Sequence, residues 1–325
     1  MRRFASIALL VSPLFLGACA VTPDSTTAKP DPFVEFQRKE ARLYAIGHKL
    51  ATSNASECAK TEPSVGVLLH DAQAYKYADR VKQALGLTGD FGVQAVAAGS
   101  PAAQAGILRN DTLLEVDGVA VDSLPDRRDW QRLADLRQLM AASLEDGQVD
   151  LVWRTASGDV RRASVASTAI CESAFELVSG KADARADGRR VLIGENFAGL
   201  DYAEDEFAAV LAHEMAHNLL GHLGKRSGWS IRQIRMSERE ADRLAPWLLA
   251  NAGYDPSAVV RMLQRWGPRH GGGILRKPTH DGWDERVEYL ELELKKIDAA
   301  TRASRDGRAN WQIAFSREPE LIQQR

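Results

Sequence analysis

The sequence has no excess of one charge, and it lacks the basic blocks with interleaved aromatic side chains that nucleic-acid-binding proteins carry. Among its 325 residues, 42 are Lys or Arg and 44 are Asp or Glu, so the formal net charge is −2. We therefore expect no nucleic-acid partner. A membrane-spanning run is also missing, because the apolar stretch Ile7 to Leu16 is shorter than the roughly 20 residues of a transmembrane helix.

Cysteine is scarce, and the first of the three cysteines lies in a targeting segment. A basic start and an apolar stretch lead to Leu-Gly-Ala-Cys at residues 16–19, which resembles the lipobox of bacterial lipoproteins. The resemblance implies a signal peptide over residues 1–18 and lipidation of Cys19; a secretory signal with an incidental cysteine is the alternative. The residue after the cysteine is Ala20 rather than aspartate, which resembles the sorting pattern of lipoproteins destined for the outer membrane. Residues 19–32 are expected to form a flexible tether to that lipid anchor.

The other two cysteines, Cys58 and Cys171, flank a segment whose residue pattern differs from the rest of the chain. In an oxidising compartment an even number of cysteines favours a disulfide bond, which would join the two ends of that segment. Two separate buried thiols are the alternative. Neither cysteine lies near histidine pairs at ligand spacing, so a cysteine-based metal site is not expected.

Histidine is also scarce, yet two of the seven histidines lie four residues apart in His-Glu-Met-Ala-His at residues 213–217. On an α-helix such residues share one face, so His213 and His217 can offer their imidazoles to one metal ion. Glu214 is one step round the helix, where its carboxylate can accept a proton from attacking water. This pattern predicts a catalytic zinc site, and a helix that carries the residues by chance is the alternative.

The third metal ligand is not fixed by this motif. The longer pattern with glycine at 220 and histidine at 223 does not occur, since both positions hold leucine. His222 is predicted to point to the opposite helical face, as a structural or exposed residue. Glu238 begins Glu-Arg-Glu-Ala-Asp, and Asp242 lies on the same helical face, where a carboxylate can orient a metal-bound histidine. Glu240 is predicted to be solvated.

The motifs His-Glu-x-x-His and Glu-x-Glu-Ala-Asp together resemble the gluzincin zinc metallopeptidases of the HtpX and BepA type. The similarity covers about residues 170–295 and a helix near 33–57, and it includes Thr-His at 279–280 with an arginine six residues later. The resemblance implies one Zn²⁺ per chain and an α+β, mainly helical zincin domain with a small β-sheet. It also implies zinc ligands His213, His217 and Glu238, the general base Glu214, a carboxylate behind the ligands at Asp242, and substrate or oxyanion contacts at His280 and Arg286.

The sequence departs from this family pattern at three places. Asp281 replaces the usual proline after the late histidine, and Asp-Ala-Arg-Ala at 183–186 replaces the usual Asn-Ala-Phe-Ala. Pro246 falls inside the helix that carries Glu238 and is expected to kink or break it. The run Gly-Arg-Arg-Val-Leu-Ile at 188–193 resembles the strand that lines the cleft in the family.

Between the two later cysteines the pattern changes to short strands and tight turns. Residues 91–96 alternate like a strand, and Asp-Gly at 117–118 predicts a hairpin. Gly-Ser-Pro-Ala-Ala-Gln-Ala-Gly-Ile at 99–107 and the run that follows closely resemble a PDZ domain of the bacterial protease type. We expect this module over residues 83–169; a β-rich insert without a binding role is the alternative.

A helix over about 126–144 and two later strands complete the expected PDZ module. PDZ domains bind extended peptides by adding a strand to an open sheet edge, often with capture of a terminal carboxylate. The carboxylate-binding loop is expected at residues 87–92, a weak match to the family's loop. Residues 61–82 are expected only to connect the first helix to the module.

About 300 residues once the signal is removed can bury two cores. We expect a zincin domain, built from residues 33–60 and 170–300, that is interrupted by the PDZ module. The charged and polar tail at 301–325 is expected to be partly disordered, with local docking through Trp311, Ile313 and Phe315 as the alternative.

The expected function is that of an endopeptidase, lipid-anchored in the outer membrane and facing the periplasm. It would cleave misfolded or misassembled envelope proteins, while the PDZ module binds substrate or regulates access. A proteolytically latent chaperone or peptide-binding scaffold is the alternative. Intramembrane zinc proteases need several spans, and thermolysin-type aminopeptidases usually carry PDZ modules at the other end of longer chains. The sequence names no assembly machinery or second copy as partner.

Overall fold

The computed structural model describes residues 30–125, 130–223, 228–270 and 281–322. The predicted signal peptide, the lipidated Cys19 and His280 lie outside the described residues. Residues from Asp31 onward belong to one compact unit. None of the helices in the described ranges is long and apolar enough to cross a membrane.

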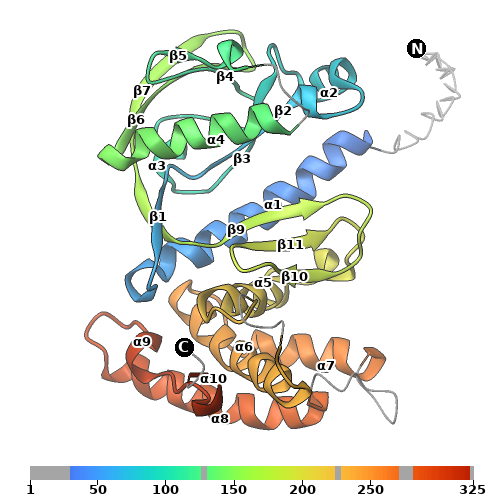
Figure 1. The fold of residues 1–325 in the computed structure, drawn as a ribbon, viewed down its shortest axis with the longest axis vertical. Helices are drawn as coiled ribbons and strands as arrows, with labels where there is room; N and C mark the ends of the chain where they lie inside the picture. The colour runs from blue at the N-terminus through green and yellow to red at the C-terminus, as the bar shows by residue number, and fades with distance from the viewer. Residues whose placement is uncertain (1–29, 126–129, 224–227, 271–280, 323–325) are drawn as a thin grey trace, which may run out of the picture. The chain divides into compact units, whose positions relative to one another are not determined.

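The fold is α+β, as predicted, and most of its helices surround one large hydrophobic core (Figure 1). The first helix begins where its sequence favours a start: Asp31 accepts a hydrogen bond from the Phe33 backbone N–H at 2.9 Å, and Pro32 occupies the first turn. Leu43 and Leu50 on this helix are fully buried. The helices of this helical part are α1 (Pro32–Ser53), α5 (Glu204–Leu219), α6 (Ile231–Asn251), α7 (Ala258–His270), α8 (Trp283–Ala303), α9 (Trp311–Ala314) and α10 (Pro319–Ile322).

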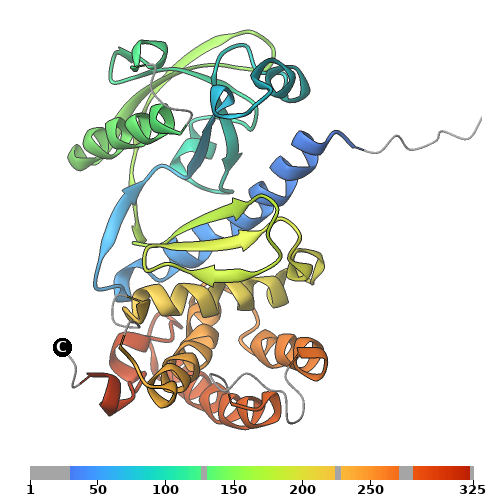
Figure 2. The same ribbon diagram turned by 45° about the vertical axis from the view of Figure 1, so that its right-hand side comes forward.

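A three-stranded sheet packs against α1 and α5 in the helical part (Figure 2). Its order is β10–β11–β9, with β9 parallel and β10 antiparallel to the central β11. Side chains of β9 and β11, among them Phe175 and Ile193, enter the same core as α1. The arrangement leaves β10 as an edge strand. The strands are β9 (Ala174–Val178), β10 (Ala184–Ala186) and β11 (Arg190–Gly194).

A β-rich module with its own core lies between α1 and β8 in the sequence. Its six-stranded sheet runs β2–β3–β4–β6–β7, with β5 paired to β4. Phe91, Leu136 and Trp153 fill the core with at most 1% exposure. The elements are β2 (Val67–Asp71), α2 (Ala78–Leu85), β3 (Phe91–Val96), α3 (Pro101–Gln104), β4 (Thr112–Val116), β5 (Val119–Ala120), α4 (Gln131–Ser143), β6 (Gln148–Arg154) and β7 (Val160–Ala166).

The structure places β2 in this sheet, although the sequence suggested only a connector over residues 61–82. Strand β2 pairs with β3, its other edge meets no strand of the described residues, and α4 packs against it. The expected loop at residues 87–92 leads into β3, which begins at Phe91 and is paired with both β2 and β4, so β3 offers no open edge to a peptide. The loop before the open-edged strand contains Gly66, at φ +81°. Strand β2 is short and mostly buried, and therefore gives little alternation in the sequence.

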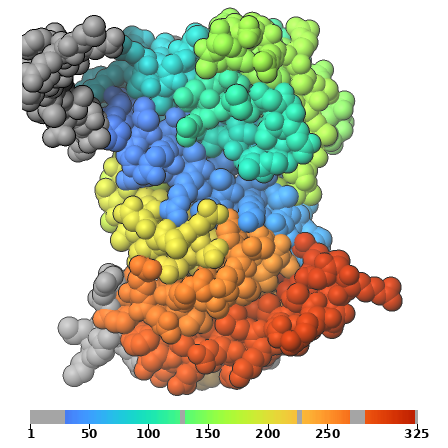
Figure 3. Space-filling view, turned by 180° about the vertical axis from the view of Figure 1, so that it is seen from behind, coloured from blue at the N-terminus to red at the C-terminus, as the bar shows by residue number. Residues whose placement is uncertain are grey.

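Helix α1 belongs to both parts of the fold. Its later residues enter the helical core, while its first turns contact β3 of the β-rich module. Gln37 donates to Asn110 at 2.7 Å, and Gln94 of β3 donates to Glu40 at 2.6 Å. In the space-filling view α1, in blue, lies directly against the module (Figure 3). The helix thus gives the module a polar, hydrogen-bonded support.

A two-stranded stem carries the chain into and out of the module. Strands β1 (Thr61–Ser64) and β8 (Thr168–Cys171) pair antiparallel, with Thr61 opposite Cys171. Next to the stem Cys58 and Cys171 form a disulfide bond, with their Cα atoms 5.6 Å apart. Structural disulfides are typical of proteins in oxidising compartments. The bond closes a loop of 113 residues that contains the whole module.

Removal of this disulfide is expected to lower the free energy of unfolding by about 2–5 kcal/mol, because a long loop gains much entropy when it is opened. The paired variant Cys58→Ser/Cys171→Ser tests this by urea denaturation. Reduction of the wild-type protein should reproduce the loss, whereas the paired variant should not respond to reductant. Equal stability of wild-type and variant would contradict the expectation.

The structure answers two other expectations in part. Pro246 does not break its helix: α6 runs from Ile231 to Asn251 around it. A proline in that place costs the bond to the carbonyl four residues earlier, but packing of the buried α6 holds the helix together. In the described part of the tail Trp311 docks, as the alternative predicted: it is buried and donates to Asn54 at 3.0 Å, and Leu321 is buried too, whereas Ile313 is exposed.

Candidate metal site

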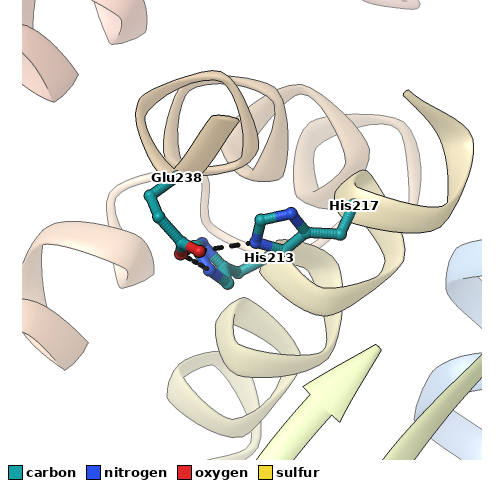
Figure 4. A group of neighbouring side chains, drawn as sticks. All are labelled: His213, His217 and Glu238. Atoms are coloured by element: carbon teal, nitrogen blue, oxygen red, sulfur yellow. Dashed lines mark ion pairs between the residues drawn. The ribbon is translucent and has the colours of Figure 1, made fainter. Parts of the chain in front are cut away.

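Three side chains from two helices converge on one point (Figure 4). His213 and His217 lie one turn apart on α5, and Glu238 faces them from α6. The Glu238 carboxylate oxygen Oε2 lies 3.5 Å from His213 Nε2 and 3.4 Å from His217 Nε2. The three ligand atoms lie within 4.8 Å of one another and can hold a metal ion.

These atoms fit a zinc ion in spacing and in chemistry. Tetrahedral zinc with bonds of about 2.0–2.1 Å keeps neighbouring ligand atoms roughly 3.4 Å apart. Two imidazole nitrogens and one carboxylate oxygen also form one of the usual donor sets of a zinc site that keeps an open position. The distances from Glu238 to both histidines match this spacing.

Helix α5 holds its two histidines rigidly because it is the buried centre of the helical part. Phe207, Leu211 and Met215 are fully buried on this helix. Acidic residues occupy its first turn, where they interact favourably with the helix dipole. His213 and Glu214 remain partly exposed and line a cavity, whereas His217 is buried.

A buried chain of polar groups stands behind His213. The Nδ1 atom of His213 lies 3.0 Å from Asp242 Oδ1. This is an ion-pair contact whose alignment is poor for a hydrogen bond. Arg286 donates two hydrogen bonds to Asp242, at 2.7 and 2.5 Å, and the Tyr289 hydroxyl donates a third at 2.5 Å. Asp242 and Arg286 are 4% and 6% exposed. Arg286, which also lines the cavity, is thus primarily a partner of Asp242.

The electrostatics of this cluster favour a cation. Burial alone would lower the pKa of His213, but Asp242 and Glu238 outweigh it and raise the pKa to about 10. Burial would raise the pKa of Asp242, yet Arg286 and His213 hold it well below its usual range. The carboxylates that raise the pKa of His213 also create a negative electrostatic potential at the point between the three ligands.

A second series of buried polar side chains stands behind His217, and the sequence analysis did not predict it. His222 is buried, which agrees with the structural role of the two predicted for it, but it lies on the side of His217 rather than on the opposite face: its Nδ1 atom is 2.8 Å from His217 Nδ1. On its other side His222 Nε2 lies 2.9 Å from Glu240 Oε2, and Glu240 is fully buried rather than solvated. Burial lowers the pKa of His222 to about 4, which Glu240 only partly counteracts. Burial opposes a low pKa for Glu240, but His222 and Arg317 lower it to about 2.

The turn after α5 explains the position of His222. The helix ends at Leu219, and Gly221 adopts a left-handed conformation with φ +68°. The His222 N–H bonds to the His217 carbonyl and the Gly221 N–H to the Asn218 carbonyl, which defines a Schellman motif. The chain therefore folds back under His217. A glycine just after an apolar helix was the available signal, and projecting the helix past it gave the wrong face.

A cavity of about 630 Å³ opens beside the ligands. His213, Glu214, His217 and Glu238 line it together with Arg286. The edge strand β10 also lines it, whereas β11, in the run expected to line the cleft, is the central strand of its sheet. Large apolar side chains make up much of the remaining wall, among them Phe197, Val210, Met262, Trp266 and Trp283.

The structure therefore gathers five of the predicted site residues, namely His213, Glu214, His217, Glu238 and Arg286, around one cavity and sets Asp242 directly behind them. His280 cannot be placed, since it lies outside the described residues. The neighbouring Asp281, one of the departures from the family pattern, accepts two hydrogen bonds from Arg239 at 3.0 and 2.8 Å. It lines the same cavity.

Comparison with known proteins identifies the β-rich module. The PDZ domain family matches residues 92–155, which confirms the prediction of a PDZ domain over these residues and implies binding of peptide or protein partners. The match does not extend to the helical part, and no peptidase family was matched. Searches of curated proteins and of solved structures each found no match.

Proposed function

We propose that the chain is a zinc-dependent endopeptidase whose PDZ domain binds substrate or regulates access to the metal site. The observation that carries the proposal is the convergence of His213, His217 and Glu238 on one point, with Glu214 in the same cavity. A metal site alone does not make an enzyme, but a carboxylate beside an open zinc position is the arrangement that hydrolysis requires.

When bound, zinc supplies Lewis acidity, which makes water a nucleophile near neutral pH. Glu214 then accepts the proton of the attacking water and passes it to the departing amine nitrogen. Asp242, held by Arg286, keeps the His213 ring oriented throughout. We also propose that Arg286 and His280 contact the substrate.

The cavity supports an extended peptide as substrate. Strand β10 pairs with β11 along one edge, and its other edge meets no strand in the described ranges. A peptide that adds to this edge would satisfy the open backbone groups of β10 and cross the cavity beside the ligands. The apolar wall with Trp266 and Trp283 supports a preference for large apolar side chains.

The same mode of binding applies to the β-rich module. The outer edge of β2 is open beside α4, so a second segment of the same substrate can add there. Two weak sites on one chain bind an extended polypeptide more tightly than either alone, which favours unfolded proteins over folded ones. The disulfide fits an envelope compartment, and we propose misfolded or misassembled envelope proteins as substrates, reached from a lipid anchor at Cys19 in the outer membrane.

Metal content and proteolysis measured on one preparation test the proposal. We expect one zinc per chain and cleavage of an unfolded protein and of an amino-blocked peptide. Chelator should abolish both cleavages, and added zinc should restore them. Failure to cut the amino-blocked peptide while free peptides are trimmed would point to an aminopeptidase.

The PDZ match also supports a second candidate, a latent chaperone or peptide-binding scaffold. Protein with one zinc per chain that suppresses aggregation of unfolded substrates, yet never cuts them, would favour this candidate and overturn the first.

A further inference from the structure

The C-terminal segment contacts the buried chain of side chains behind His217. The guanidinium of Arg317 donates to both oxygens of Glu240, at 3.0 Å from Nε and 2.8 Å from Nη2. The backbone N–H of Glu318 donates to the same carboxylate at 2.5 Å. Arg317 also donates to the Leu220 carbonyl at 3.3 Å, in the turn that places His222. The two residues that contact Glu240 lie 77 and 78 positions after it in the sequence, and Arg317 lies 97 positions after Leu220.

The carboxylate of Glu240, at the end of this series of side chains, fixes the direction of each hydrogen bond in it. A carboxylate can only accept, so Glu240 requires a proton on His222 Nε2. A neutral His222 then has a free lone pair on Nδ1, which accepts the Nδ1 proton of His217. His217 is left with an unprotonated Nε2, the atom that faces Glu238 at 3.4 Å. Together these hydrogen bonds leave the metal-facing nitrogen of His217 with a free lone pair.

We propose that Arg317 and Glu318 form a positioning element for the metal site, acting through Glu240 and His222 on the tautomer and ring orientation of His217. The inference deepens the proposed function, since it names residues on which that zinc site depends. It concerns metal binding, and so it can succeed or fail independently of proteolysis.

Each histidine of the ligand pair is then held by a network that ends in a carboxylate and an arginine; Arg286 is buried, whereas Arg317 is partly exposed. Asp242 and Arg286 hold His213, while Glu240 and Arg317 reach His217 through His222. Partners of this kind typically change metal affinity by about 10- to 100-fold when they are removed. The network behind His217 differs in one respect: its outer arginine belongs to the last residues of the described chain.

Zinc affinity of the full chain, measured by competition with a chromophoric chelator, tests the proposal. Because two side chains separate Arg317 from His217, Arg317→Met should weaken binding by up to about 10-fold, less than the loss of His222 itself. With Co²⁺ in place of zinc, the visible absorption spectrum of the variant should also change, because a reoriented imidazole alters the ligand field. Circular dichroism and thermal unfolding of the metal-free protein establish that the variant is folded.

Arg232→Met is the matched control. Arg232 also holds the C-terminal segment, through Glu320 at 2.7 Å, but no hydrogen bond or ion pair recorded for it reaches Glu240. Its zinc affinity should equal that of wild type. Equal losses in both variants would overturn the proposal and point to general docking of the tail. A folded Arg317→Met variant with wild-type affinity and spectrum would overturn it directly.

A double-mutant cycle with His222→Phe adds a test that a merely structural role would not pass. If Arg317 acts through His222, Arg317→Met should cause no further loss of affinity once His222 is replaced. Fully additive losses would contradict the route. A wild-type chain that binds no divalent metal overturns the inference together with the metal site, whereas zinc binding that follows these expectations without any proteolysis overturns only the proposed peptidase.

Discussion

Replacing Glu214 with glutamine is expected to slow peptide hydrolysis by about a hundred- to ten-thousandfold, the usual contribution of a general base. Glu214 lines the same cavity as the three ligands and can reach attacking water, but glutamine cannot accept its proton. The ligands His213, His217 and Glu238 are unchanged, so the variant should still bind one zinc per chain. Initial rates on an amino-blocked peptide and metal analysis of the same sample measure both effects.

Asp205→Asn is the matched control for this variant, because Asp205 lies on the same helix and is 41% exposed, with one long ion pair to Arg261 at 3.8 Å. It loses the same charge at a site away from the metal, and its rate should equal that of wild type. Undiminished hydrolysis by zinc-loaded Glu214→Gln would remove Glu214 from the mechanism. The same inactive, zinc-loaded variant should retain substrates in envelope extracts, which would identify them.

The second large effect is expected for Asp242→Ala, through two separate consequences. The substitution leaves Arg286 buried without its charge partner, and breaking a buried pair in this way typically costs about 3–5 kcal/mol of unfolding free energy. It also removes the carboxylate behind His213, which should weaken zinc binding by about 10- to 100-fold. Urea denaturation of the metal-free protein and zinc competition report the two consequences separately.

A second variant separates the stability of the pair from its effect on the metal. Asp242→Ala combined with Arg286→Met removes the unpaired charge, so much of the stability should return while zinc affinity stays low. If the double variant also regains wild-type affinity, Asp242 does not orient His213, and its place behind the ligand has no functional meaning.

The predictable part of the site is the part that rests on local geometry. The spacing of His213 and His217 implies one helical face in any context, and α5 does hold both imidazoles beside one cavity. Glu238 comes from a different helix, and it was predicted from the run Glu-Arg-Glu-Ala-Asp, which sets Asp242 on the same helical face, together with the resemblance to a family. The structure brings it within 3.5 Å of both histidines.

His222 and Glu240 show why the remainder was missed. Helical periodicity placed His222 on the opposite face, as a structural or exposed residue, and placed Glu240 in solvent. Periodicity, however, describes a residue's direction only while the helix continues and its neighbours are known. Gly221 ends α5 and turns His222 back under His217, and the C-terminal segment covers Glu240. The glycine was visible in the sequence, whereas the covering by Arg317 was not.

The β-rich module gives a parallel case. Its inner strands and hairpin were recognisable because alternation and tight turns are local properties. Strand β2 was not recognised, because a buried edge strand of five residues carries no clear alternation, and pairing with β3 across the intervening helix α2 decides its place. The sequence placed peptide binding at the loop at 87–92, whereas in the structure the open edge is that of β2, beside α4.

The sequence by itself determined the α+β class, the PDZ module and the residues able to hold a metal, because short-range spacing and turn chemistry carry that information. Only the tertiary structure decided which buried groups stand behind each ligand, which strand edges are open, and that the tail docks beside Glu240. Those features are contacts between segments far apart in the chain, and they depend on burial that makes an unpaired charge costly. Such contacts leave no periodic signal in the sequence of either partner.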